Sequence, residues 1–92
     1  MIVYAECEFI VPSAHSLKEK RAVLQRMITR TKQKYNVSIA EIDHQDVWQR
    51  TLLALVSVAS TQQAAEKELK RAIAFLESYP EWQCLNIHQE FL

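Results

Sequence analysis

The sequence predicts a small α+β domain whose four strands and two helices follow one another in the order β-α-β-β-α-β. Three observations support this prediction. Residues 2–11 alternate as a strand does, two later segments repeat apolar residues at helical spacing, and each of those segments begins at a capping motif. The 92 residues leave no room for a linker, so residues 1–92 are predicted to form one domain.

The first strand is predicted over residues 2–11, where apolar residues occupy every second position, and Pro12 ends it. The first helix is predicted over residues 17–34. Ser16 and Glu19 form a capping box at its start, because hydroxyl and carboxylate can each accept from a free amide of the first turn. The apolar stripe of this helix comprises Leu17, Leu24, Met27, Ile28, Thr31 and Tyr35.

The second half of the chain repeats this pattern. Further strands are predicted at residues 37–43, 51–60 and 82–91. The middle one, "TLLALVSVAS", is almost continuously apolar, which is typical of a central strand. Ser60 and Gln63 form a second capping motif, and a second helix is predicted over residues 62–78.

Two strand-helix-strand units with right-handed crossovers interleave into one antiparallel sheet with both helices on one face. This arrangement is the ferredoxin-like sandwich. The predicted order across the sheet is fourth, first, third and second strand, which makes the two most apolar strands central. The sequence therefore predicts a ferredoxin-like fold with a four-stranded antiparallel sheet.

Composition limits the possible functions. The chain has no glycine, which excludes phosphate-binding glycine loops and the nucleophile elbow. No apolar run is long enough to cross a membrane, and the first residues do not resemble a signal peptide, so we expect a cytoplasmic protein. No motif indicates a bound cofactor.

The first helix concentrates positive charge. Seven of the eleven lysines and arginines fall within residues 18–34 together with a single acid, although the whole chain has a formal net charge of zero. Such a face either binds nucleic-acid phosphates or is simply solvated. The candidate nucleic-acid-binding residues are Lys18, Lys20, Arg21, Arg26, Arg30, Lys32 and Lys34.

The sheet face away from the helices forms a second candidate site. If Val3, Ala5, Cys7 and Phe9 face the helices, several aliphatic side chains face the other way. An apolar exposed face favours a subunit interface, and we expect a homodimer, with an open binding face for another partner as the alternative. The candidate interface residues are Ile2, Tyr4, Ile10, Leu53, Leu55 and Trp48.

The segment "EIDHQDVWQR" holds polar residues and one large aromatic. Asp43, His44 and Asp46 could be metal ligands, but a polar turn is the simpler interpretation and no metal is expected. Trp48 either plugs the connector against the core or is an exposed contact residue; the plug is the commoner role. Arg50 is expected to pair with Glu41 or Asp43 across the hairpin.

The remaining reactive side chains do not predict an enzyme. No histidine has a nucleophile or carboxylate at a recognised catalytic spacing. Cys7 and Cys84 fall on opposite faces of neighbouring strands under the assignment above, so no disulfide is expected.

The motifs "HSLKEKR", "NVSIAE" and "DVWQR" resemble those of the YlxP-like family of small uncharacterised bacterial proteins. The resemblance covers nearly the whole chain and implies a ferredoxin-like fold. Members are often encoded beside genes for transcription termination, translation initiation and ribosome maturation, which implies a role linked to RNA or the ribosome. The matching residues are Ser16, Leu17, Lys18, Lys20, Arg21, Asn36, Val37, Ser38, Glu41, Trp48, Gln49 and Arg50.

Two function hypotheses remain at this point. The first is a non-enzymatic binding protein whose basic first helix contacts RNA or a ribosomal particle. The alternative is a protein-interaction or assembly module that uses the exposed sheet face and has no nucleic-acid role.

Overall fold

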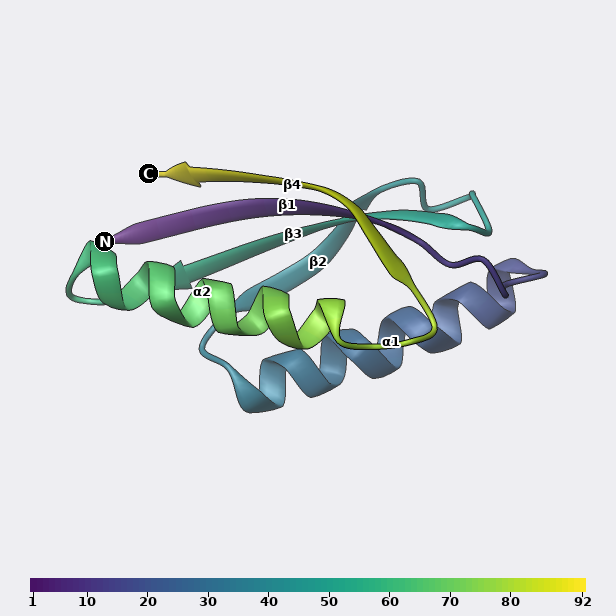
Figure 1. The fold of residues 1–92 in the computed structure, drawn as a ribbon, viewed down its shortest axis with the longest axis horizontal. Helices are drawn as coiled ribbons and strands as arrows, with labels where there is room; N and C mark the ends of the chain where they lie inside the picture. The colour runs from purple at the N-terminus through teal and green to yellow at the C-terminus, as the bar shows by residue number, and fades with distance from the viewer.

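The predicted element order is confirmed. A computed structural model describes residues 1–92. Its elements are β1 (Ile2–Ile10), α1 (Leu17–Lys34), β2 (Ser38–Asp43), β3 (Arg50–Val58), α2 (Gln62–Glu77) and β4 (Gln83–Phe91). The strands form one antiparallel sheet in the order β2-β3-β1-β4, and both helices lie on one side of it (Figure 1). This is the predicted ferredoxin-like arrangement.

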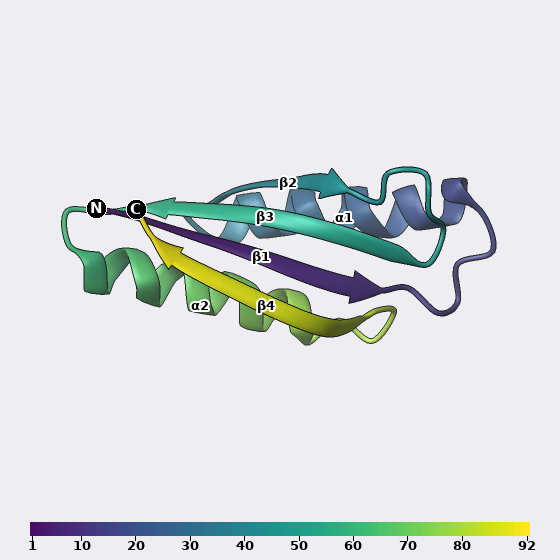
Figure 2. The same ribbon diagram turned by 90° about the horizontal axis from the view of Figure 1, so that it is seen from above.

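The two helices cover different parts of the sheet. α1 packs against the edge strand β2, whereas α2 packs mainly against the central strands β1 and β3 and reaches β4 only in part (Figure 2). The core fills the space between these layers, and Val3, Ala5, Cys7 and Phe9 of β1 are fully buried in it. Neither helix is both long enough and apolar enough to span a membrane.

The helix starts follow the capping rules, with one correction. The Ser16 hydroxyl accepts from the Glu19 amide at 3.1 Å, as predicted, and the Glu19 carboxylate accepts from the His15 amide at 2.6 Å. The cap of α2 is Thr61 rather than Ser60, because the Thr61 hydroxyl is the one that accepts from the Ala64 amide, at 3.1 Å. A Ser-Thr pair offers two possible caps, and the sequence pattern selected the wrong one.

The predicted faces of β3 were wrong. Leu53 and Leu55 are fully buried under the helices and do not lie on the open sheet face. They stand opposite Cys7 and Ala5 of β1, and directly opposed residues of an antiparallel pair project to the same face. The β3 side chains on the open face are Leu52, Ala54, Val56 and Val58.

The assignment of Cys84 to the face opposite Cys7 was also wrong. A register shift between Glu8 and Phe9 places Cys84 opposite Phe9, on the helix side of the sheet. Both cysteines are free thiols, and burial is the main reason why the pKa of Cys7 is raised to about 12. A bulge of this kind leaves no clear signal in a single sequence.

Candidate nucleic-acid interface

The fold separates charge between its two layers. Ten of the eleven lysines and arginines lie on α1 and α2, and only four of the eleven acids do. The helices therefore carry a formal charge of +6 and the remainder of the chain −6. The neutral chain thus carries its excess positive charge on the helices and its excess negative charge on the strands and loops.

Most of the predicted cations of α1 are exposed and unpaired. Lys18, Arg21, Arg30, Lys32 and Lys34 are exposed, and none has a carboxylate within 4.0 Å. Their positions at the helix surface follow from the apolar stripe, which turns the opposite face outward. These five side chains can exchange their solvent counterions for phosphate groups without breaking an ion pair.

Arg26 is partly exposed, but its guanidinium already has a carboxylate partner. Its guanidinium donates to both carboxylate oxygens of Glu81, at 3.0 and 3.2 Å, and lies 5.5 Å from the centre of the Tyr79 ring. This contact ties the middle of α1 to the segment that follows α2. Arg26 therefore links α1 to this loop and is a poorer candidate for phosphate binding than its neighbours.

Lys20 does not belong to the basic surface, which corrects its assignment as a nucleic-acid contact. The residue is fully buried, and its ammonium lies 3.0 Å from Glu41 and donates to the main-chain oxygen of His44. Glu41 also accepts from the Thr51 hydroxyl at 2.6 Å. Lys20 precedes Leu24 by one turn, so it lies on the buried stripe of α1 and reaches past the core to the hairpin.

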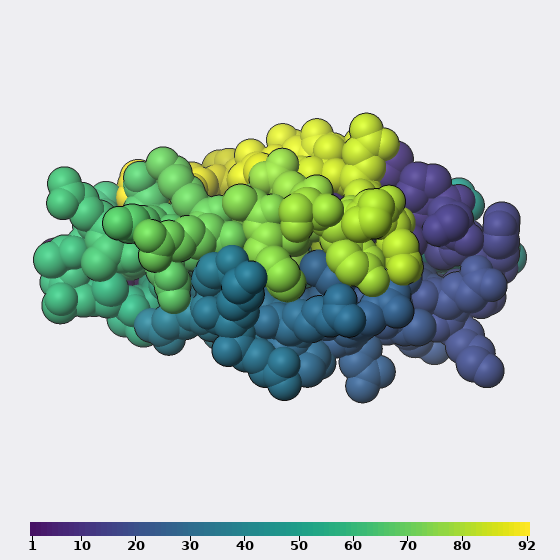
Figure 3. Space-filling view, turned by 60° about the horizontal axis from the view of Figure 1, so that its bottom comes forward, coloured from purple at the N-terminus to yellow at the C-terminus, as the bar shows by residue number.

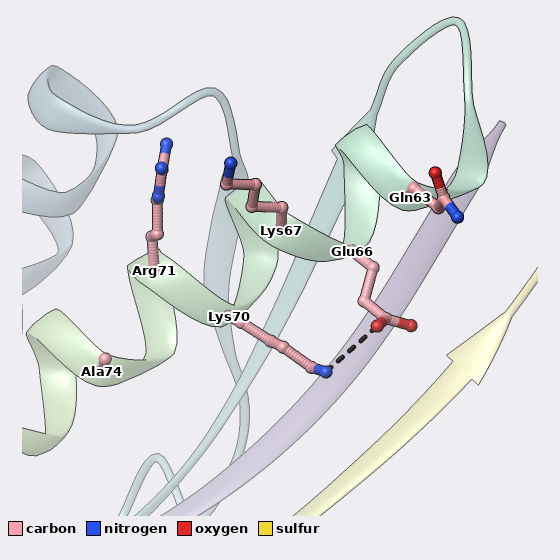
Figure 4. A pocket seen from close by; sticks show the side chains of 6 residues that line it. All are labelled: Gln63, Glu66, Lys67, Lys70, Arg71 and Ala74. Atoms are coloured by element: carbon pink, nitrogen blue, oxygen red, sulfur yellow. Dashed lines mark hydrogen bonds and ion pairs between the residues drawn. The ribbon is translucent and has the colours of Figure 1, made fainter.

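The second helix contributes cations that the sequence analysis missed. Figure 4 shows Lys67 and Arg71 projecting from one flank of α2, while Glu66 and Lys70 form an ion pair of 3.0 Å on the other. A shallow surface hollow connects the two flanks and is lined by Gln63, Glu66, Lys67, Lys70, Arg71 and Ala74. Lys67 and Arg71 have no ion-pair partner.

One cation of α1, Lys34, reaches α2 at the seam between the two helices. The Lys34 ammonium lies 5.0 Å from the centre of the Phe75 ring, one helical turn beyond Arg71. Tyr35 packs on the same ring at 5.7 Å between ring centres. Figure 3 shows α1 and α2 side by side as one surface. We call the exposed, unpaired set the helix-layer cations: Lys18, Arg21, Arg30, Lys32, Lys34, Lys67 and Arg71.

The open sheet face mixes apolar and acidic side chains. Ile2, Tyr4 and Ile10 lie on this face, as predicted, and Ile2 stands opposite Val58. The Tyr4 hydroxyl donates to Glu6 at 2.8 Å, and this hydrogen bond is the main reason why the pKa of Tyr4 is raised. The face is therefore apolar in patches and negative between them.

The hairpin between β2 and β3 is tied to β1 through Glu8. Its carboxylate accepts from Arg50 at 2.6 Å and lies 3.1 Å from the His44 imidazole. The hydrogen bond from Arg50 is the main reason why the pKa of Glu8 is lowered. Arg50 thus pairs with Glu8 and not with the predicted Glu41 or Asp43, because β3 runs beside β1 and brings position 50 opposite Ile10.

Trp48 is an exposed residue rather than a plug. Its surface is 52% exposed, whereas the neighbouring Gln49 is the residue that seats the hairpin, donating to the main-chain oxygens of Pro12 and Ala14 at 3.2 Å. The His44 ring lies between two carboxylates, with Nε2 3.1 Å from Glu8 and Nδ1 4.0 Å from Asp43. No group of three histidine, cysteine or acidic side chains is placed to hold a metal ion.

Comparisons with known proteins agree with the fold and with the sequence resemblance. The model of a family described as "Protein of unknown function (DUF503)" matches residues 2–89. The uncharacterized protein YlxP of Bacillus subtilis (strain 168) is 56% identical over 81 residues, which cover 88% of each chain.

Two designed proteins with solved structures share the architecture. The de novo designed protein Foldit4 matches with a TM-score of 0.61 at 9% identity and covers 100% of this chain and 99% of its own. The designed protein LFR1 1, described as having a ferredoxin fold, matches with a TM-score of 0.50 at 17% identity, covering 98% and 83%. At such low identity these matches bear on the fold alone.

Proposed function

The chain belongs to the DUF503 family of proteins of unknown function, and from this premise we propose that it is a non-enzymatic protein that binds RNA through its helix-layer cations. We place this binding at the ribosome or in its assembly. The observation that carries the proposal is the set of seven exposed cations without a carboxylate partner, all on the helices of a chain whose formal net charge is zero.

The charge separation gives the proposal a physical basis. Lysine and arginine gain affinity by releasing counterions from phosphates, and each contact contributes separately to the salt dependence. The excess negative charge on the strands and loops is repelled by the same polyanion, so the molecule approaches RNA with its helices first. The aromatic pair Tyr35 and Phe75 at the seam brings apolar surface close to the cations.

Among the four groups with altered pKa values, neither thiol is activated as a nucleophile. Each shift has a structural cause: burial for Cys7 and Cys84, the bond to Glu6 for Tyr4, and the bond from Arg50 for Glu8. A thiol whose pKa is raised to about 12 is a poor nucleophile at neutral pH.

The test is the binding of fluorescently labelled ribosomal RNA fragments, followed by anisotropy across a salt series. For about four phosphate contacts on a single strand, affinity is expected to fall roughly 50-fold between about 50 and 200 mM salt. Arg30→Gln with Lys34→Gln should weaken binding and lower the salt slope by about 1.4.

The matched control changes the net charge equally outside the helices. Gln45→Glu with Gln83→Glu alters two exposed residues of the hairpin and of β4 and should leave the salt slope unchanged. An equal loss of affinity in both double variants would show that only net charge matters. Absence of binding at low salt would overturn the proposal.

A protein-interaction module is the second candidate function. The opposed pair Ile2 and Val58 favours it, because these side chains are 41% and 55% exposed on the open sheet face. Partner capture that survives nuclease treatment and is lost in Val58→Asp would support this function. Leu53 is unsuitable for the test, since it lies in the core.

A further inference from the structure

The β4 edge leaves part of the core uncovered. Phe91 and Ile87 of β4 stand opposite Val3 and Cys7 of β1, so all four side chains project to the helix side of the sheet. The β1 pair is fully buried, whereas Phe91 and Ile87 are 52% and 41% exposed. Figure 3 shows the reason: the yellow atoms of β4 emerge beyond the green atoms of α2.

The backbone of the same strand is also unpaired on its outer side. The Leu92 amide donates to the Ile2 oxygen at 2.9 Å, so the even-numbered residues of this regular stretch bond to β1. The amides and carbonyls of Ile87, Gln89 and Phe91 therefore point away from the sheet. A further strand placed here would find both hydrogen-bonding groups and an apolar surface.

We propose that a second copy of this chain occupies the edge, with the two β4 strands paired antiparallel about Gln89. This register sets Ile87 of each copy opposite Phe91 of the other, so the uncovered apolar side chains cover one another. It also sets His88 opposite Glu90 of the second copy, twice, on the open face of the joined sheet. Within one chain these two side chains already lie 2.8 Å apart, and the pairing gives each a second such partner. The odd-numbered residues then exchange their outward amide and carbonyl groups.

The sequence of β4 favours this register over its neighbours. Pairing about Ile87 would set His88 opposite Asn86 and Glu90 opposite Cys84, without any ionisable pair. Pairing about His88 would place two imidazoles against each other and set Ile87 opposite Gln89. Only the register about Gln89 matches apolar with apolar and acid with imidazole at the same time.

The flank of α2 completes the proposed contact. Glu66 pairs with Lys70 (Figure 4) and accepts from Gln89 at 3.4 Å, so the flank of α2 contacts the side chain that lies between Ile87 and Phe91 on the helix side. In the proposed pairing, the two Gln89 side chains therefore meet at the twofold axis, with an apolar contact of Ile87 and Phe91 on either side of them. The opposite edge lacks the strip, since Ile39 of β2 is only 4% exposed beneath α1.

The first test separates backbone pairing from side-chain effects by analytical ultracentrifugation at about 100 μM, where weak specific association remains measurable. Gln89→Pro removes an outward amide that the single chain does not use, and an edge strand tolerates this change. Gln89→Ala removes the side chain and keeps the amide. We expect dimers for the wild type and Gln89→Ala, and monomers with unchanged circular dichroism for Gln89→Pro.

The second test exchanges the charged pair. In His88→Glu, the new carboxylate lies opposite Glu90 of the second copy. In Glu90→Lys, His88 loses its acceptor on the second copy. Each variant should therefore self-associate roughly tenfold more weakly. An equimolar mixture should form mixed dimers, detected by native mass spectrometry, because the introduced carboxylate of one variant then meets the introduced ammonium of the other. A monomeric wild type, a dimer that persists in Gln89→Pro, or a mixture without mixed dimers would overturn the proposed interface.

Discussion

The two edges of the sheet differ in how well the helices close them. Ile39 of β2 and Ile87 of β4 both project to the helix side, yet Ile39 is 4% exposed and Ile87 is 41% exposed. On the β2 side, Lys20 links α1 to Glu41 and to the hairpin, and α1 packs directly over the strand. On the β4 side, a single long bond joins the Glu66 and Gln89 side chains.

This difference shows how similar strands in one sheet acquire different roles. The β2 edge is closed by the buried ion pair of Lys20 and Glu41, so Lys20 is not part of the exposed basic surface of α1. The β4 edge keeps its apolar side chains and free backbone groups, which suits it for contact with another chain. The same helix, α1, therefore both closes the β2 edge and carries exposed cations.

The largest expected effect comes from breaking the ion pair at the β2 edge. Lys20→Ala should lower the free energy of unfolding by about 3–5 kcal/mol, because it leaves the Glu41 carboxylate, which is 17% exposed, without its cation. Urea denaturation followed by circular dichroism measures this loss. Lys18→Ala, an exposed lysine of the same turn, is the control and should cost at most about 0.5 kcal/mol.

Replacing both partners refines the same comparison. Lys20→Met with Glu41→Met removes the two charges together, so it should cost much less than Lys20→Ala. If Lys20→Ala and Lys18→Ala were equally stable, the ion pair would not be what closes this edge.

The next effect compares the two edges directly. Ile39→Ala should cost about 2–5 kcal/mol, since it opens a cavity beneath α1. Ile87→Ala should cost less than about 1.5 kcal/mol, because much of that side chain is already in water. Thermal unfolding at submicromolar concentration measures both variants without a contribution from self-association. Equal losses would mean that β4 is covered as well as β2.

The elements whose local signals were unambiguous could be predicted from the sequence. The bounds of α1 were predicted correctly because Ser16 and Glu19 mark its start and the apolar stripe gives its period. The strand order followed from the element order and crossover handedness. The β3 faces could not be predicted, because Leu52 and Leu53 are equally apolar and only the pairing with β1 distinguishes them.

The candidate site was predicted in part, for a similar reason. The apolar stripe of α1 correctly predicted that five of its cations are exposed. It failed at Lys20, because a long side chain on the buried stripe can reach a carboxylate at the end of the core. Lys67 and Arg71 lie far from α1 in the sequence, and only the packing of α2 beside α1 joins them to the same surface.

The smallest expected effect concerns Glu8, which ties the β2–β3 hairpin to β1. Its folded-state pKa lies below the ordinary value, chiefly through the bond from Arg50, so its ionised form contributes stability above the unfolded-state pKa. That contribution is lost as the pH falls through the folded-state pKa. Arg50→Met should therefore raise the pKa of Glu8 and reduce the loss of stability in this acidic window.

Carboxyl NMR titration, with urea denaturation at neutral and acidic pH, measures both effects of Arg50→Met. Lys70→Met is the matched control, because Lys70 pairs with Glu66 and does not contact Glu8. It should leave the titration of Glu8 unchanged. An unchanged pKa of Glu8 in Arg50→Met would assign the shift to His44, the other group that bonds to this carboxylate, and would make the imidazole the tie between hairpin and sheet.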